Sequence, residues 1–275
     1  MDTKKKKDIK WSNPFTSDIK GLRHCTYKSK YLGIPVGFGI YIPPDYKKGH
    51  KKYEVIYWLH GKRGDESEGY RYGVVKTLDR AIREGKMEGA IMVLVNGTPY
   101  SMYSDYKNGT VPAETTFIKE LIPFIDSNYR TVDHRSGRGI EGFSMGGNGA
   151  LKIALKYPGL FSSIVSCGGS FHDLESIKAN RPGIFEEVFG SDDGYYDQNN
   201  CFKLAVKNLE DIKGFLSIKT VVGSKDFTLE SNKKLWRFFE QLKIRFEKKL
   251  IKDLEHDCSD YYKELGRETL DFHFN

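Results

Sequence analysis

A serine between glycines has the spacing expected of a catalytic nucleophile. Residues 142–147 read Gly-Phe-Ser-Met-Gly-Gly and fit the pattern Gly-x-Ser-x-Gly around Ser144. This pattern places a serine on a sharp turn from a strand into a helix and leaves its Oγ exposed. Small residues are needed two positions before and after the serine, because the two backbones approach closely there. The pattern predicts that Ser144 attacks a carbonyl carbon, with an ordinary glycine-rich turn as the alternative.

A serine nucleophile needs a histidine base further along the chain. Three histidines follow Ser144, at His172, His256 and His273. His172 comes directly after the next predicted strand, too early for the order serine, acid, histidine. His273 lies two residues from the C-terminal end of the sequence, in a segment expected to fray. His256 follows the last predicted strand and is the expected base.

The acid that orients this base is expected at Asp226. It ends a predicted strand that runs into a polar turn, and it lies between Ser144 and His256 in the sequence. Its carboxylate would fix the tautomer of His256 and stabilise the imidazolium. One alternative is that Asp226 caps a helix predicted from Leu229. Another is that Asp257 is the acid, although a residue next to the base is badly placed to bond its ring.

The oxyanion formed from an ester needs hydrogen-bond donors, usually two backbone N–H groups. One is expected at Met145, at the positive end of the helix after the serine. The other is expected at Lys62, in the glycine-rich loop after a predicted strand, with Gly61 as the alternative. His60 is expected to hydrogen-bond the backbone of this loop. No metal or other cofactor is expected, because the histidines lack metal-ligand spacing.

The elements that must position these residues alternate along the chain. Short apolar runs typical of buried strands occupy residues 53–59, 90–95, 136–143, 161–167, 215–222 and 246–251. Apolar residues recur at helical spacing in residues 73–84, 114–129, 147–157, 229–242 and 259–270. Two further extended runs, 25–31 and 35–42, predict an antiparallel pair at a sheet edge. The alternation predicts an α/β protein with a mainly parallel sheet flanked by helices and its site at the carboxyl ends of the strands.

Two details of this pattern carry separate expectations. Pro123 falls inside the helical pattern at 114–129 and predicts a kink or a late start. The long polar segment at about 172–214 is typical of a lid or specificity insertion.

Length and charge suggest one catalytic domain with a basic extension. The 275 residues are 39% hydrophobic and 13% aromatic, enough for one large α/β core. The net charge of +7 includes the run Lys4–Lys7. Residues 1–20 are therefore expected to form a flexible basic tail and residues 21–275 a single catalytic domain, with attraction to an acidic polymer as the alternative role of the run.

Membrane and nucleic-acid functions are not expected. No apolar run approaches the roughly 18–20 residues that span a bilayer, and no aromatic-basic nucleic-acid motif is present. Residues 1–14 lack the apolar run of a signal peptide. The protein is expected to be soluble and extracellular, with its leader outside this sequence, or cytoplasmic if the sequence is complete. Its four scattered cysteines are expected to be buried free thiols, with one disulfide as the alternative.

The chain resembles the esterase D superfamily, and most of all the feruloyl esterases of carbohydrate esterase family one. The resemblance runs from about Cys25 to the end of the sequence. Its motifs lie at residues 59–64, 114–131, 142–151, 223–227 and 256–257. It implies an α/β-hydrolase fold with Ser144 as nucleophile, Asp226 as acid and His256 as base.

Departures from the family pattern concern the wall of the pocket. The family often has Gly before the histidine and Trp two residues after it, where this chain has Glu255 and Cys258. An aromatic wall beside the base is therefore not expected. Tyr100, Met102 and Tyr103 follow a predicted strand and are expected to line the acyl pocket together with Cys258, with ordinary loop packing as the alternative.

The expected function is hydrolysis of feruloyl (hydroxycinnamoyl) esters on plant cell-wall xylan through an acyl-enzyme on Ser144. The alternatives are an acetyl xylan esterase, an S-formylglutathione hydrolase and a siderophore esterase. Phe143 stands where S-formylglutathione hydrolases tend to have His. An inactive hydrolase fold that binds carbohydrate is the alternative from another class. The expected partner is a small-molecule or polysaccharide-linked ester, and no protein partner is indicated.

Overall fold

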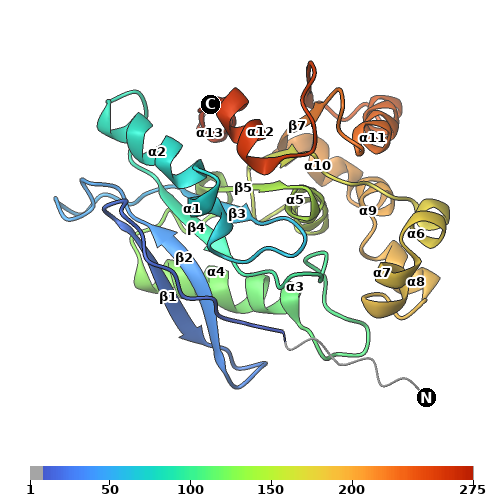
Figure 1. Ribbon diagram of the computed structural model, residues 1–275, viewed down its shortest axis with the longest axis horizontal. Coiled ribbons are helices and arrows are strands. Elements are labelled where there is room, and N and C mark those ends of the chain that lie inside the picture. The colour runs from blue at the N-terminus through green and yellow to red at the C-terminus, as the bar shows by residue number, and fades with distance from the viewer. Residues whose placement is uncertain (1–8, 275) are drawn as a thin grey trace.

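One mixed β-sheet organises the protein, for which a computed structural model describes residues 9–274 (Figure 1). Its eight strands, within those residues, are arranged in the order β1-β2-β4-β3-β5-β6-β7-β8. They are β1 (Leu22–Lys28), β2 (Pro35–Tyr41), β3 (Val55–Leu59), β4 (Ile91–Val95), β5 (Arg138–Phe143), β6 (Ser163–Cys167), β7 (Ser217–Gly223) and β8 (Glu247–Ile251). β2 pairs antiparallel with β1 and β4, and all other pairs are parallel. The mainly parallel sheet with an antiparallel pair at its edge is thus confirmed.

Helices cover both faces of this sheet. They are α1 (Glu68–Arg71), α2 (Val74–Arg83), α3 (Ala113–Thr115), α4 (Ile122–Asn128), α5 (Met145–Lys156), α6 (Leu174–Asn180), α7 (Pro182–Glu187), α8 (Asp193–Asp197), α9 (Cys201–Lys207), α10 (Leu209–Phe215), α11 (Leu229–Gln241), α12 (Cys258–Leu265) and α13 (Glu268–His273), with a 3-10 turn at Arg135–Gly137. No helix in residues 9–274 has the length and apolar character needed to cross a bilayer.

The period of two along β3 explains why the sheet has two apolar faces. Ile56 and Trp58 pack with residues of α2 and α12, whereas Tyr57 and Leu59 pack with residues of α5 and α11. All five residues of β3 are buried, because the strand lies in the middle of the sheet between β4 and β5. The core is therefore divided into two layers, one on each side of the sheet.

The helical pattern around Pro123 is irregular in the structure, as the sequence predicts. A π-helical segment, η1 (Thr116–Leu121), connects α3 to α4, and Pro123 lies at the start of α4. Proline has no N–H to donate and its ring crowds the preceding turn. The wider π turn accommodates this within an otherwise continuous helical path.

The C-terminal region differs from the prediction in two respects. The single helix expected at 259–270 is two helices, because Gly266 takes φ = 55° and ends α12 before α13 begins. His273, expected in a fraying segment, instead has a side chain that is only 1% exposed. Its Nδ1 lies 2.7 Å from Ser163 Oγ and its Nε2 lies 3.2 Å from Glu141 Oε2. These contacts fix α13 against the sheet.

Residues 9–20 also differ from the prediction of a flexible basic tail at 1–20. Trp11 is buried in the core, and its carbonyl accepts a hydrogen bond of 2.6 Å from the Gly37 amide. The Asn13 amide donates to Glu66 Oε1 over 2.6 Å, and Phe15 stacks on Tyr70. This segment is apolar and aromatic enough to pack against β2 and α1. The run Lys4–Lys7 lies outside the described residues.

Candidate active site

The turn at Ser144 is the strained strand-to-helix connection that the glycine pattern predicts. β5 ends at Phe143, α5 begins at Met145, and Ser144 takes φ = 57° and ψ = −113°, unusual for a residue with a side chain. A Cβ on Gly142 would lie 2.5 Å from the Gly146 carbonyl, and a Cβ on Gly146 would lie 2.0 Å from the oxygen of the last residue of β3. Both positions therefore require glycine.

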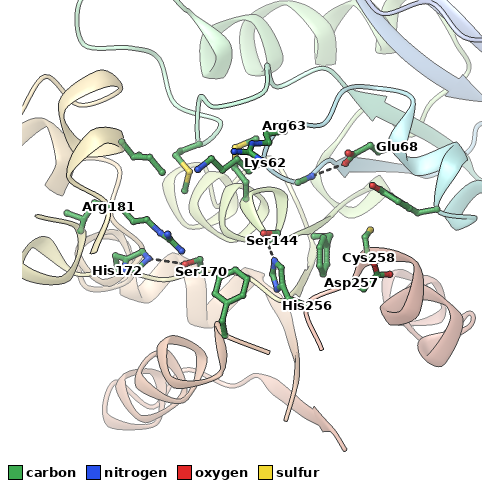
Figure 2. A pocket seen from close by; sticks show the side chains of 18 residues that line it. Lys62, Arg63, Glu68, Ser144, Ser170, His172, Arg181, His256, Asp257 and Cys258 are labelled. Carbon is green, nitrogen blue, oxygen red and sulfur yellow. Dashed lines mark hydrogen bonds between the residues drawn. The ribbon is translucent and has the colours of Figure 1, made fainter. Parts of the chain in front are cut away.

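Ser144, His256 and Asp226, from three different loops, form one hydrogen-bonded chain at the carboxyl edge of the sheet. Figure 2 shows the contact between Ser144 and His256. His256 Nε2 lies 2.8 Å from Ser144 Oγ, and His256 Nδ1 lies 2.7 Å from Asp226 Oδ2. Asp226 follows β7 and His256 follows β8. With the Nδ1 proton donated to the carboxylate, Nε2 is the acceptor for the Ser144 hydroxyl. The structure thus brings together the three residues expected to act as nucleophile, base and acid.

Asp226 is buried and takes part in more hydrogen bonds than the sequence indicates. Its Oδ1 accepts from the amide and the hydroxyl of Thr228, both at 2.7 Å, so it also shapes the turn before α11. Its Oδ2 accepts from the Tyr261 hydroxyl at 2.6 Å. Burial by itself would raise the pKa of Asp226, but the hydrogen bonds from His256, Tyr261 and Thr228 lower it below its ordinary value. The carboxylate is therefore held ionised beside the imidazole.

Tyr261 is a positioning residue that sequence reasoning missed. It lies in α12, is fully buried, and its hydroxyl accepts a 2.7 Å hydrogen bond from the Gly223 amide while it donates to Asp226. It sits five residues after His256. The helical spacing of α12 indicates an apolar face there, but nothing in that spacing shows that the hydroxyl reaches the acid. That contact exists only because α12 folds back under β7.

The other candidate acid and bases have separate roles. Asp257 caps α12, since its Oδ1 accepts from the Asp260 amide at 3.0 Å. His60 is buried and donates from Nδ1 to the Gly61 carbonyl at 2.8 Å while Nε2 accepts from the Gly97 amide at 3.1 Å. The expected loop-bonding role of His60 is confirmed. His172 lies 2.9 Å from Ser170 Oγ and lines the pocket beside Ser144.

Among the pocket-lining residues of the loop after β3, which are Gly61, Lys62 and Arg63, only the amide of Lys62 is available to an oxyanion. The Gly61 amide already donates to Glu68 Oε2 at 3.2 Å. Within residues 9–274, the amides of Lys62 and Met145 donate no hydrogen bond to a protein acceptor. Both residues line the pocket at Ser144. The engagement of Gly61 favours Lys62 as the second donor, a role that remains a prediction.

Glu68 is the buried support of this loop, and sequence reasoning did not single it out. It lies in α1, and a Cβ on Gly64 would come within 2.3 Å of its carboxyl carbon, so the loop closes over it. Burial raises the pKa of Glu68 to about 7, although the Gly61 hydrogen bond and Arg71 act in the opposite direction. Glu68 thus holds the Gly61 amide from beneath the loop.

A pocket of about 450 Å³ opens around Ser144 and His256. Met102 and Cys258 line it, as expected, but Tyr100 and Tyr103 do not. Tyr103 is completely buried, because its ring packs beside His60 and its hydroxyl donates to the His60 carbonyl at 3.1 Å. For Tyr103 the alternative of ordinary loop packing is therefore correct.

Two phenylalanines form an aromatic wall that the sequence comparison did not lead us to expect. The Phe143 and Phe227 rings lie 4.7 Å and 4.2 Å from the His256 ring, between centroids. Phe227 is 65% exposed, so much of its ring faces the pocket and solvent. Position 258 carries a cysteine and contributes no aromatic ring, as the departure from the family pattern indicates. The aromatic rings come instead from Phe143 at the end of β5 and from Phe227 in the loop after β7.

The inserted segment forms one side of the pocket. The region expected at about 172–214 contains α6 to α10. α6, α7 and α8 lie at the right of Figure 1, and α9 packs against α5. The pocket is reached from this segment by His172, Ile177, Arg181 and Ile184.

All four cysteines are free thiols, and three of them are buried.

Comparison with known proteins identifies relatives of this chain. A family model described as "Putative esterase" matches residues 29–269. The esterase Rv1288 of Mycobacterium tuberculosis is 34% identical over 155 residues, which cover 54% of this chain and 32% of that protein. An endo-1,4-beta-xylanase/feruloyl esterase of Xylanibacter ruminicola is 29% identical over 168 residues, which cover 57% of this chain and 23% of that protein. The match therefore spans about a third or less of these curated relatives.

Solved structures share the fold over almost the whole chain. A ferulic acid esterase superimposes with a TM-score of 0.77 at 22% identity, covering 92% of this chain and 96% of the other. An S-formylglutathione hydrolase from Agrobacterium tumefaciens superimposes with a TM-score of 0.75 at 20% identity, covering 92% and 94%. The fold is that of the α/β-hydrolases, as the sequence predicts.

Proposed function

This chain belongs to the putative esterase family, and we propose that it is a serine carboxylic ester hydrolase acting through Ser144, His256 and Asp226. The observation that carries the proposal is the continuous hydrogen-bonded chain from Ser144 Oγ through His256 to Asp226, at 2.8 Å and 2.7 Å. Its position on a strained turn, in a pocket open to substrate, is the arrangement that nucleophilic catalysis needs.

The first half-reaction forms an acyl-enzyme. Ser144 Oγ attacks the carbonyl carbon while its proton passes to His256 Nε2, and Asp226 stabilises the imidazolium through Nδ1. The amides of Met145 and Lys62 donate to the oxyanion of the tetrahedral intermediate. The intermediate collapses as the C–O bond to the alcohol breaks, and His256 gives its proton to the leaving oxygen.

The second half-reaction releases the acid. A water molecule gives a proton to His256 Nε2 and attacks the acyl carbon, and the resulting oxyanion uses the same two amides. The Ser144–acyl bond then breaks, and the serine oxygen takes its proton back from His256. No step requires a group beyond these residues and water.

For the substrate we propose feruloyl esters, including those on plant cell-wall xylan. The proposal is supported by the feruloyl esterase in the name of the Xylanibacter relative, by the ferulic acid esterase with the same fold, and by the aromatic wall of Phe143 and Phe227 beside His256. A planar phenolic acyl group fits against aromatic rings. On this proposal the protein acts on extracellular polysaccharide.

An S-formylglutathione hydrolase is the second candidate, because a solved enzyme with that activity superimposes about equally well. An acetyl xylan esterase would use the same catalytic residues and a shorter acyl group. Carbohydrate binding without catalysis does not require the strained turn at Ser144 or a buried Asp226 carboxylate bonded to His256.

The test is the variant Ser144→Ala, assayed with 4-nitrophenyl acetate and then with methyl ferulate, acetylated xylan and S-formylglutathione. We expect kcat for 4-nitrophenyl acetate to fall at least about 10³-fold with no change in melting temperature. The matched control is Ser162→Ala, which removes a hydroxyl just before β6, at the opposite edge of the sheet. Unchanged hydrolysis by Ser144→Ala would refute the proposal, and the wild-type rates on the panel decide the acyl group.

A further inference from the structure

Three cationic side chains line the pocket around Ser144. Lys62 and Arg63 come from the loop after β3, and Arg181 comes from the inserted segment between α6 and α7. None of the three forms an ion pair with a carboxylate of residues 9–274. Two of them lie beside aromatic rings: Lys62 Nζ lies 5.8 Å from the Tyr100 ring centre, and the Arg181 guanidinium lies 6.0 Å from that of Phe227.

Glu68 and Asp257, the two carboxylates that line the same pocket, form no ion pair with these three cations. Glu68 accepts from the Gly61 amide, and its pKa, raised by burial to about 7, leaves it only partly ionised near neutral pH. Asp257 caps α12 through its Oδ1. The arrangement is also polarised. Figure 2 shows Arg181 and His172 on one side of Ser144, with Glu68, Asp257 and Cys258 on the other.

His172 lies on the same side of Ser144 as Arg181 and adds no charge of its own near neutral pH. Burial and the nearby Arg181 lower its pKa to about 4, against smaller effects of Asp173. It is therefore neutral near pH 7 and can accept or donate a hydrogen bond beside Ser170. On this side of the pocket the charge facing Ser144 is thus positive.

An unpaired guanidinium at the wall of a partly enclosed pocket is a binding group for an anion. Arginine presents a planar fork of donors that matches a carboxylate, and such hydrogen bonds are stronger than neutral ones. Screening by water is weaker inside a pocket than on an open surface. A neutral ester would leave these donors without a charged partner.

We propose that the preferred substrates of this pocket are esters with a second, anionic group, a carboxylate, held by Arg181 with support from Lys62 and Arg63. This inference rests on the proposed ester hydrolysis at Ser144, because it uses the same pocket and the same nucleophile, and it competes with a neutral feruloyl ester as the preferred substrate. The carboxylate belongs to the acyl or to the alcohol portion of the ester, and separate substrate pairs distinguish the two. In either case Arg181 is a specificity-determining residue.

The acyl arm of the test compares 4-nitrophenyl adipate, which carries one free carboxylate, with 4-nitrophenyl hexanoate. The two differ only in a carboxylate or a methyl group at the end of the same chain. The alcohol arm compares 3-acetoxybenzoate with 3-acetoxybenzamide, in which a neutral amide replaces the carboxylate. The measured quantity is the ratio of kcat/KM for the anionic ester to that for its neutral partner.

For the wild type we expect this ratio to be about tenfold or more in one arm, as one charge-assisted hydrogen bond would give. Arg181→Gln should lower that ratio about tenfold, and Arg181→Lys should retain part of it. Arg245→Gln is the matched control and should leave the ratio unchanged. Arg245 is exposed and lies before the first residue of β8, and the pocket lies at the carboxyl ends of the strands. The preference should also weaken as salt is raised.

Two outcomes would overturn the inference. One is a wild-type ratio of one or less in both arms, while neutral esters are hydrolysed and Ser144→Ala abolishes their hydrolysis. The other is a preference that survives intact in the folded triple variant Lys62→Gln, Arg63→Gln and Arg181→Gln. The first outcome leaves the proposed function standing. Failure of the proposed function itself would be recognised separately, by activity that persists in Ser144→Ala.

Discussion

At the scale of single residues, two buried carboxylates support the site: Asp226 holds His256, and Glu68 holds the loop after β3. Hydrogen-bond donors lower the pKa of Asp226, which stays ionised, whereas burial raises the pKa of Glu68 to about 7, so that Glu68 is partly protonated near neutral pH. The difference has a physical cause. Asp226 accepts from Thr228, Tyr261 and His256, but Glu68 receives one backbone hydrogen bond at 3.2 Å.

The pKa of Glu68 gives a prediction for stability against pH. The pKa of the Glu68 carboxyl group is raised to about 7 in the folded protein. The group therefore contributes its full stabilisation of the fold at pH values below its ordinary pKa of 4.5. This contribution is lost as pH rises from there through about 7. The loss amounts to at most about 3 kcal/mol. Glu68→Gln keeps an acceptor for the Gly61 amide but cannot ionise.

The measurement is the free energy of unfolding in urea between pH 4.5 and pH 8 for wild type and Glu68→Gln. We expect the variant to gain stability relative to wild type as pH rises. Parallel pH profiles for the two proteins would show that Glu68 ionises without cost in the folded state. Glu84→Gln is the control, because Glu84 is exposed on the surface after α2.

At the scale of secondary-structure elements, the position of Ser144 depends on how closely α5 approaches β3 and β5. The helix is also fixed from its outer side by a buried ion pair, in which Lys152 Nζ lies 2.8 Å from Glu114 Oε2 of α3. Burial alone would raise the pKa of Glu114, but Lys152 and Lys156 lower it to about 2. The turn at Ser144 is thus held from both sides of α5.

We predict that Gly146→Ala disrupts this approach. The added Cβ would lie 2.0 Å from the Leu59 oxygen, which belongs to backbone that cannot rotate away. We expect a loss of stability of about 2–3 kcal/mol, typical of overpacking, together with loss of esterase activity as Ser144 is displaced. Thermal unfolding followed by circular dichroism, with the rate on 4-nitrophenyl acetate, measures both.

The control for this variant is Gly214→Ala in α10. A Cβ there has no atom within 4 Å, and glycine in a helix is replaced by alanine with a small gain in stability, about 0.4–1 kcal/mol. Equal melting temperatures for Gly146→Ala and wild type would mean that α5 can move away from β3 without cost, contrary to the geometry described above.

At the scale of the whole molecule, the C-terminal helices join the far end of the chain to the centre of the sheet. α13 is attached through His273, which contacts Ser163 in β6 and Glu141 in β5, and both the His273 and Glu141 side chains are almost completely buried. α12, directly before it, carries Tyr261 to the Asp226 carboxylate. Anchoring the end of the chain therefore also supports the acid of the site.

We predict that His273→Ala destabilises the fold by about 2–4 kcal/mol, because Glu141 loses a buried polar partner. His273→Gln keeps a hydrogen-bond donor of similar reach and should recover part of the loss. The free energy of unfolding in urea, measured for both variants, tests this. If His273→Ala unfolds at the same urea concentration as wild type, the contact with Glu141 does not stabilise the protein.

Local patterns in the sequence were sufficient for the fold and for the proximity of Ser144, His256 and Asp226. A period of two or of 3.6 residues follows from backbone geometry alone, so most strands and helices were predicted within a few residues. In a parallel sheet the loops after successive strands meet at one edge. Chain order therefore already placed Ser144, Asp226 and His256 near one another, and the glycines around Ser144 carried the signature of a close backbone approach.

Only the tertiary structure decided which side chains surround these three. Tyr261 bonds to Asp226 because α12 packs under β7, and Tyr103 is buried because its hydroxyl finds the His60 carbonyl. Phe227 and Arg181 reach the pocket from a loop and from the inserted segment. These contacts join residues distant in the sequence, and their existence depends on distances across the folded chain. No local period or spacing encodes such distances, which is why the wall of the pocket and its charge became visible only in three dimensions.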